Sequence, residues 1–216
     1  MAGTLGPHDP GRLAAERLSA EALDRSLDEA LAARATGSAL WLFAYGSLMW
    51  NPGFAFVAKR VGTVYGYHRD FSLWSRVNRG TPERPGLVLS LERGGSCRGL
   101  AFRLADSTSR DELRKLWRRE MSLQSYHPRW LEVHAGAERL PVLTFVVNRA
   151  CSGYAGRLPM EAMVRAIATA RGKYGSSAEY LFQTQATLEC LGIRDVRVQR
   201  LVERVRAHLT AGAPHG

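Results

Sequence analysis

Residues 41–50 decide the fold of this chain, and they have the sequence Trp41-Leu42-Phe43-Ala44-Tyr45-Gly46-Ser47-Leu48-Met49-Trp50. An apolar and aromatic run of this kind is typical of a buried strand. The strand passes directly into a turn of small residues, where glycine permits main-chain conformations that other residues avoid. Amide groups of such a turn are able to converge on an anion, such as a carboxylate or a developing oxyanion. On these residues alone, a tight turn after a core strand is the simpler interpretation.

The residues after this segment predict a strand-rich region that is followed by helices. Runs rich in Val, Tyr, Phe and Leu are separated by turn signals such as Arg93-Gly94-Gly95. The predicted strands are 40–45, 57–66, 69–77, 86–92, 97–104, 130–135 and 141–148. The predicted helices are 12–35, one from a cap at 107–109 to about Met121, 160–172, 176–191 and 195–209. Within the first of them, Ser19 is able to cap a restart of the helix. This order indicates an α+β fold built on a curled sheet or small barrel.

The 216 residues are enough for one ample domain with its own core. We expect an N-terminal helical extension at 1–38, the main domain at 39–210 and a C-terminal tail at 211–216. No secretory signal is visible at the start, and no apolar run approaches the roughly 20 residues of a membrane span. Cys97, Cys151 and Cys190 are odd in number and far apart, which argues against a disulfide framework. They favour a reducing, cytoplasmic location.

The charge of the chain is strongly basic, with 30 Lys and Arg against 20 Asp and Glu and a net charge of +10. Such a balance suits a nucleic acid, an anionic membrane surface or a small anionic substrate. The arginines are scattered, and the clearest stripe is Arg197, Arg200 and Arg204 on one face of a predicted helix. This stripe is positioned to meet phosphates, although a solvated helix face is the simpler interpretation.

Several common catalytic motifs are missing from the sequence. Ser47 lacks the second glycine of a G-x-S-x-G nucleophile elbow. The six histidines form no HExxH pair, and neither a P-loop nor a GxGxxG follows the first strand. We therefore expect neither a metal nor a nucleotide cofactor.

Glu120 interrupts the apolar face of the helix that is predicted to end near Met121. Leu113, Leu116, Trp117 and Glu120 follow the i, i+3, i+4, i+7 spacing of one helix face. One interpretation is that Glu120 pairs with an arginine at the edge of this face. In the other, the carboxyl group is buried and faces a cavity, so that desolvation raises its pKa and makes it a general base.

These segments, together with three others, resemble the ChaC-type γ-glutamylcyclotransferases that act on glutathione. The matching pieces are Tyr45-Gly46-Ser47-Leu48-Met49-Trp50-Asn51-Pro52, Arg79-Gly80-Thr81-Pro82-Glu83-Arg84-Pro85-Gly86-Leu87-Val88, Leu116-Trp117-Arg118-Arg119-Glu120-Met121, Ser125-Tyr126-His127-Pro128-Arg129-Trp130 and Glu179-Tyr180-Leu181. They occur in the family's order and span about residues 40–192. The loop Ser122 to Ser125 follows the longer, bacterial-type version of the family.

The resemblance implies a γ-glutamylcyclotransferase-like fold, a small mixed β-barrel with packed α-helices. It implies that Glu120 is the proton acceptor and that no metal or organic cofactor takes part. Arg79, Tyr126 and Tyr180 lie in matching segments, and they either orient a carboxylate or the peptide or are structural. The residues implied to hold the γ-glutamyl group are Ala44, Tyr45, Gly46, Ser47, Leu48 and Met49.

The implied activity is the cleavage of glutathione to 5-oxoproline and cysteinylglycine by attack of the substrate's own α-amine. The expected partner is this small molecule, with no nucleic acid and no membrane, and the sequence leaves the oligomeric state open. Three other functions remain. They are a cyclotransferase for other γ-glutamyl amines or dipeptides, a catalytically silent metabolite-binding module, and a basic nucleic-acid-binding protein.

Overall fold

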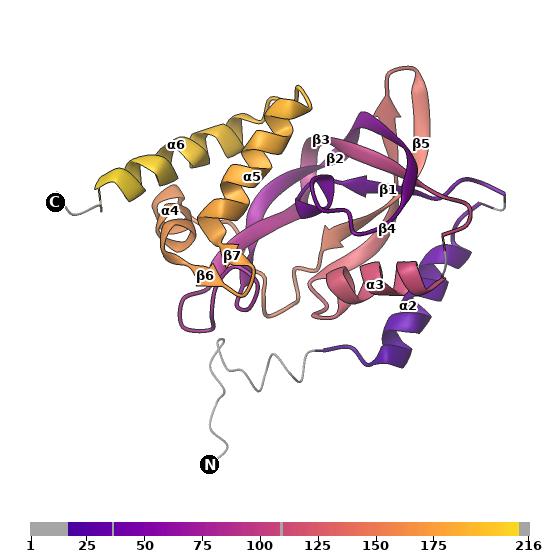
Figure 1. Cartoon of the computed structure of the whole chain (residues 1–216), viewed down its shortest axis with the longest axis horizontal. Helices are drawn as coiled ribbons and strands as arrows, with labels where there is room; N and C mark the ends of the chain where they lie inside the picture. The colour runs from indigo at the N-terminus through magenta and orange to yellow at the C-terminus, as the bar shows by residue number, and fades with distance from the viewer. Residues whose placement is uncertain (1–16, 36, 109, 212–216) are drawn as a thin grey trace, which may run out of the picture. The chain divides into compact units, whose positions relative to one another are not determined.

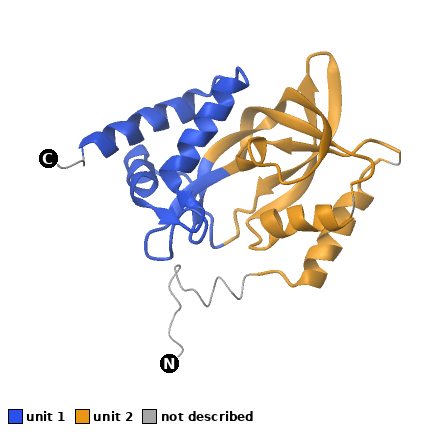
Figure 2. Cartoon of the chain, viewed as in Figure 1, with its two compact units in different colours: residues 1–12, 71–89, 152–216 blue, residues 13–70, 90–151 orange. Residues whose placement is uncertain are grey.

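The computed structural model describes residues 17–35, 37–108 and 110–211. The chain divides into two compact units (Figure 2). We call residues 13–70 and 90–151 the barrel unit, and residues 1–12, 71–89 and 152–216 the helical unit. Both units are assembled from segments that are distant in the sequence, and each is described by itself below.

Five strands close into a barrel in the order β1-β3-β2-β4-β5 (Figure 1). They are β1 (Trp41–Ala44), β2 (Phe56–Ser75), β3 (Gly86–Leu104), β4 (Tyr126–Ala135) and β5 (Glu138–Val147). β1 is antiparallel to β3 but parallel to β5, where Leu42 is paired with Leu143. β4 is antiparallel to both β2 and β5. The predicted small barrel of mixed strands is therefore confirmed.

Within residues 40–148, the strands are longer and fewer than the sequence pattern predicts. The runs 57–66 and 69–77 form the single strand β2, and 86–92 and 97–104 form the single strand β3. Gly94 and Gly95, which suggested a turn, lie inside β3 with φ angles of +98° and +72°, and Gly66 lies inside β2 with a φ angle of +79°. Glycine adopts such angles without steric cost, so the chain bends there and the ladder continues.

β4 begins at Tyr126 rather than at the predicted residue 130, although it contains Pro128. The N–H of Asn148 donates to the carbonyl of Ser125 at 2.9 Å, which sets the phase of the β4–β5 ladder. Pro128, three residues on, pairs with Phe145 at a position whose backbone groups point away from β5. A proline, which has no N–H to donate, is tolerated there.

The barrel unit buries aromatic and aliphatic side chains from its strands and from the helix α3 (Arg110–Met121). Phe43 and Trp117 are at most 1% exposed, and the Trp117 ring meets Phe145 edge-on at 5.5 Å. Gly99 permits the close approach of β3 to β1, because a Cβ at that position would lie 2.4 Å from the carbonyl oxygen of Ala44. This packing fixes the end of β1.

The N-terminal helix α2 (Ala20–Ala32) is shorter than the predicted 12–35, of which residues 12–16 lie outside the described residues. Ser19 caps it as expected, since its Oγ accepts from the N–H of Ala22 at 3.2 Å. The helix packs on α3, where Arg114 forms a two-bonded ion pair with Asp24 and Trp117 Nε1 donates to Ser26 Oγ at 3.1 Å. Of the cap candidates for α3, Ser109 lies outside the described residues.

The helical unit contains α4 (Met160–Thr169), α5 (Ser177–Cys190) and α6 (Val196–Ala211). The predicted helix 160–172 ends at Thr169, because a short hairpin of β6 (Arg171–Gly172) and β7 (Gly175–Ser176) follows. Ser176 and Glu179 then form a reciprocal capping box at the start of α5. On α6, Arg204 of the arginine stripe pairs with Glu161 of α4 at 2.6 Å.

None of the helices in the described part of the chain is long and apolar enough to cross a membrane.

Candidate active site

The turn after β1 forms one short 3-10 turn, η1 (Ser47–Met49). The N–H of Met49 donates to the carbonyl of Gly46 at 2.9 Å, and the N–H of Asn51 donates to that of Ser47 at 2.9 Å. The N–H groups of Ser47 and Leu48 bond no other described residue, as expected at the start of such a turn. Two main-chain donors are thus available for an anion.

The side chains of this segment are mostly part of the core. Ala44 and Tyr45 are 1% and 7% exposed, and Leu48 and Met49 are 7% and 6% exposed. Their contribution to a binding site is therefore through the main chain. Ser47 is half-buried and is the one polar side chain of this turn that is free of the core packing.

Three buried hydrogen bonds hold the turn on the barrel. The Tyr45 hydroxyl donates to the carbonyl of Phe145 at 2.7 Å, and Thr144 Oγ1 donates to that of Phe43 at 3.0 Å. Arg69 Nε donates to the carbonyl of Tyr45 at 3.0 Å, although this arginine is only 4% exposed. A hydrogen-bonded framework of this kind pre-organises the main chain before any ligand binds.

Glu120 lies in the last turn of α3, and its side chain is 13% exposed. Its Oε1 atom is fully buried and accepts no well-directed hydrogen bond from any described residue. Burial raises the pKa of this carboxyl above its ordinary value of 4.5, and the nearby Arg119 guanidinium offsets only part of that rise. The acid is therefore buried and also has an arginine partner, so the pairing of the first interpretation and the burial of the second occur together. Its role as the base stays a prediction.

Arg119 is the partner, and it also contacts the turn. Its Nε lies 3.0 Å from Glu120 Oε1, and its Nη2 donates to Ser47 Oγ at 2.9 Å. Its Nη1 donates to the carbonyl of Asn51 at 2.6 Å. One guanidinium group thus connects the candidate base with both ends of the 47–51 segment.

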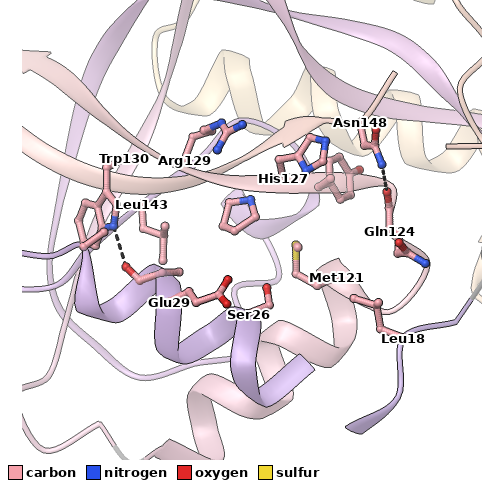
Figure 3. Close-up of a pocket in the computed structure, with 14 residues that line it drawn as sticks. Leu18, Ser26, Glu29, Met121, Gln124, His127, Arg129, Trp130, Leu143 and Asn148 are labelled. Carbon is pink, nitrogen blue, oxygen red and sulfur yellow. Dashed lines mark hydrogen bonds between the residues drawn. The ribbon is translucent and has the colours of Figure 1, made fainter. Parts of the chain in front are cut away.

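Tyr126 is half-buried at the start of β4 and lines a cavity of about 460 Å³ in the barrel unit. Figure 3 shows this cavity. The cavity lies between α2, which contributes Glu29, and β4, which contributes Trp130. Trp130 Nε1 closes one side by donating to the carbonyl of Ala30 at 2.8 Å. Neither Glu120 nor the 44–49 segment lines this cavity.

Arg79 and Tyr180 lie together in the helical unit. The Arg79 guanidinium is 5.5 Å from the centre of the Tyr180 ring, and the Arg79 N–H donates to Ser75 Oγ at 2.9 Å. Tyr180 is 6% exposed, its ring meets Phe71 edge-on, and its hydroxyl accepts from the N–H of Leu89 at 3.4 Å. These contacts favour a structural role for Tyr180, with Arg79 as the more accessible group of the pair.

Within the described residues, no three His, Cys, Asp or Glu side chains gather as the ligands of a metal ion would. Cys97, Cys151 and Cys190 form no disulfide bond with one another.

Sequence reasoning missed the roles of Arg69 and Arg119. Alternate residues of a strand face the same side, so Arg69 lies on the same side of β2 as the buried residues Phe71 and Leu73. An arginine among these inward-facing positions was a sign in the sequence that its side chain is buried. Arg119 precedes Glu120 directly, but adjacent helix positions do not normally share a face. Its contact with the turn could not be expected from spacing.

Comparison with known proteins identifies relatives over most of the chain. A family model described as ChaC-like protein matches residues 40–208. The Escherichia coli K12 protein named glutathione-specific gamma-glutamylcyclotransferase is 36% identical over 199 residues, which are 92% of this chain and 86% of that protein. The human protein named glutathione-specific gamma-glutamylcyclotransferase 1 is 32% identical over 183 residues, which cover 82% of each chain.

Solved structures agree on the fold. A crystal structure described as a gamma glutamyl cyclotransferase specific to glutathione from yeast matches with a TM-score of 0.72 at 20% identity. The match covers 80% of this chain and 97% of that chain. It confirms the predicted fold class.

Proposed function

This chain belongs to the ChaC-like protein family, and we propose that it is a glutathione-specific γ-glutamylcyclotransferase. The names of the Escherichia coli and human relatives support glutathione as the substrate. The observation that carries the chemistry is Glu120, a buried carboxyl group whose Oε1 accepts no hydrogen bond within the described chain. Burial raises the pKa of this group, which makes it a better proton acceptor than an exposed carboxylate.

The proposed reaction is an intramolecular substitution at the γ-carbonyl of glutathione. The α-amine nitrogen forms a bond to the γ-carbon, the bond from that carbon to the cysteinyl nitrogen breaks, and water is not consumed. The products are 5-oxoproline and cysteinylglycine. Correct orientation of tethered groups recovers on the order of 7–11 kcal/mol of barrier, so holding the glutamyl chain in a bent conformation is a large part of the task.

The 44–49 segment is the proposed binding site for the γ-glutamyl group. The main-chain N–H groups of Ser47 and Leu48 are donors for its α-carboxylate, and the Ser47 hydroxyl lies beside them. The buried side chains of the segment keep these donors in place. Tyr126, which belongs to the same unit as this segment, is proposed to contact the rest of the peptide. In the helical unit, Tyr180 is proposed to support Arg79.

Glu120 is the proposed general base and then general acid. It removes a proton from the α-ammonium group so that the nitrogen lone pair is free to attack, and it returns a proton to the departing amide nitrogen. Proton transfer of this kind contributes typically about 10²–10⁴-fold in rate. Donors to the tetrahedral oxyanion contribute about 10²–10³-fold more.

The direct test is to incubate the full chain with glutathione and to measure 5-oxoproline and cysteinylglycine by mass spectrometry. We expect the two products in equal amounts. Free glutamate in place of 5-oxoproline would instead indicate hydrolysis and contradict the proposal.

A cyclotransferase for other γ-glutamyl amines or dipeptides is the alternative within the same chemistry. The base and the turn would be shared, and the preference would lie in contacts beyond the scissile bond. Comparing kcat/KM for glutathione and γ-glutamyl-alanine separates the two, and we expect glutathione to be preferred.

Nucleic-acid binding is the alternative suggested by the charge of +10. Several of the arginines are already paired, including Arg114 with Asp24 and Arg204 with Glu161. We therefore expect no salt-sensitive retention of duplex DNA at physiological ionic strength. The cellular location is a separate point. A cytoplasmic location stays a prediction, which rests on the three cysteines.

A further inference from the structure

We infer that Arg119 is a positioning residue for the proposed reaction, and that it couples the Glu120 carboxylate to the hydroxyl group of Ser47. The inference rests on the proposed function. Its basis is the geometry of a single guanidinium group. Two of its nitrogens donate hydrogen bonds to Ser47 Oγ and to the carbonyl of Asn51, and the third lies 3.0 Å from Glu120 Oε1 in an ion pair.

The first consequence concerns Ser47. Its Oγ accepts from Arg119, and its own hydroxyl proton is donated to no described residue. The hydroxyl is therefore an unused donor, and the adjacent cation makes it a stronger one. It is available for an anionic group of the substrate, the α-carboxylate or the oxyanion that develops at the γ-carbonyl.

The second consequence concerns the position of the turn relative to α3. Arg119 bonds both Ser47 and the carbonyl of Asn51, and its Nη1 would lie 3.5 Å from a Cβ placed on Gly53. The guanidinium therefore lies against the loop that leaves the turn. A planar group with several fixed donors holds such a geometry better than the point charge of a lysine.

The third consequence concerns the charge of Glu120. On α2, Asp24 and Asp28 face Arg114 and Arg110 rather than this carboxyl. His127 and Arg129 on β4 and Arg118 on α3 are exposed, and the 47–53 loop carries no charged side chain. Of the charged groups in the described chain, Arg119 alone lowers the pKa of Glu120 against the rise caused by burial. Its loss would leave the base protonated over a wider pH range.

Two substitutions of Arg119 separate the role of its positive charge from that of its several hydrogen-bond donors. Arg119→Met removes both, and we expect a roughly tenfold or larger rise in KM together with an acid limb of the kcat/KM profile that moves to higher pH. Arg119→Lys keeps the charge, so its acid limb stays near that of the wild type while its KM still rises. Arg118→Met is the matched control on the adjacent exposed residue, and we expect wild-type kinetics from it.

Ser47→Ala tests the coupling. If Arg119 acts through the serine hydroxyl, the double variant Ser47→Ala with Arg119→Met has a KM no higher than that of the more affected single variant. Independent roles would instead multiply the two effects and overturn this part of the inference. Should Arg119→Met fail to fold, the KM of Arg119→Lys decides, and an unchanged KM overturns it.

The outcomes distinguish this inference from the proposed function. A wild-type protein that makes no 5-oxoproline refutes the proposed function. An active wild type whose Arg119→Met variant keeps the same KM and the same acid limb refutes only the role of Arg119. The same holds if Arg118→Met causes equal changes, because the effect would then come from the loss of any positive charge on the helix.

Discussion

Tyr45→Phe is the substitution that most directly tests how the barrel holds the candidate site. The backbone groups of Phe145 point away from β4, toward the side of β5 that is paired with β1. Because β1 ends at Ala44, the next residue satisfies the Phe145 carbonyl with its side chain, through the Tyr45 hydroxyl at 2.7 Å. Removing this hydroxyl leaves a buried acceptor without that donor.

The expected cost follows from this burial. Tyr45 is 7% exposed and Phe145 is 2% exposed, so water does not readily replace the lost donor. An unsatisfied buried polar group costs about 1–3 kcal/mol of the free energy of unfolding. With a urea dependence of about 2 kcal/mol per M, a loss of about 2 kcal/mol lowers the unfolding midpoint by about 1 M.

Tryptophan fluorescence is the suitable probe, because four of the five tryptophans, Trp41, Trp50, Trp117 and Trp130, belong to the barrel unit. Tyr65→Phe is the matched control, since Tyr65 is 61% exposed and its hydroxyl bonds no described residue. Its free energy of unfolding should stay within about 0.5 kcal/mol of that of the wild type. Equal midpoints for the two variants would refute the reasoning.

Two further predictions concern α3. Ser26→Ala removes the acceptor of the buried Trp117 indole N–H, and we expect it to lower the free energy of unfolding by about 1–3 kcal/mol. Ser96→Ala, at an exposed position, is the control and should leave this free energy unchanged. Equal urea midpoints for the two variants would contradict the docking of α2 on α3. The pKa of Glu120 is raised in the folded state, so the ionised form is destabilising, and stability is lost as pH rises from about 4.5 through the raised pKa. Glu120→Gln should remove this loss, so in urea titrations the variant should gain stability relative to the wild type as the pH rises above about 4.5. Parallel pH dependences of the two proteins would contradict the raised pKa.

The order of strands and helices was predictable because it depends on local patterns. The buried strand before the turn, the cap at Ser19 and the acid on the inner face of α3 all follow from residue spacing. The number of strands was not predictable in the same way. Gly94 and Gly95 give the signal of a turn, and only the pairing of β3 with its neighbours shows that the strand continues through them.

Contacts between distant segments account for the rest of what the sequence left open. The strands of the β6–β7 hairpin have two residues each, which is too short for a periodic sequence pattern. The hairpin nevertheless packs closely on the loop that contains Arg79, because a Cβ on Gly172 would lie only 2.5 Å from the backbone nitrogen of Gly80. The docking of α2 depends on pairs such as Arg114 with Asp24, which are 90 residues apart. Charges at such separations carry no signal in a single sequence.

The replacement of Glu120 by glutamine tests the central claim most directly, because it keeps the shape of the side chain and removes its basicity. The measurement is the rate of 5-oxoproline formation from glutathione by the wild type and by Glu120→Gln, each first shown to be folded by its melting curve. We predict a rate about 10²–10⁴-fold lower in the variant. A folded variant that turns over glutathione at close to the wild-type rate would contradict the assignment of Glu120 as the base.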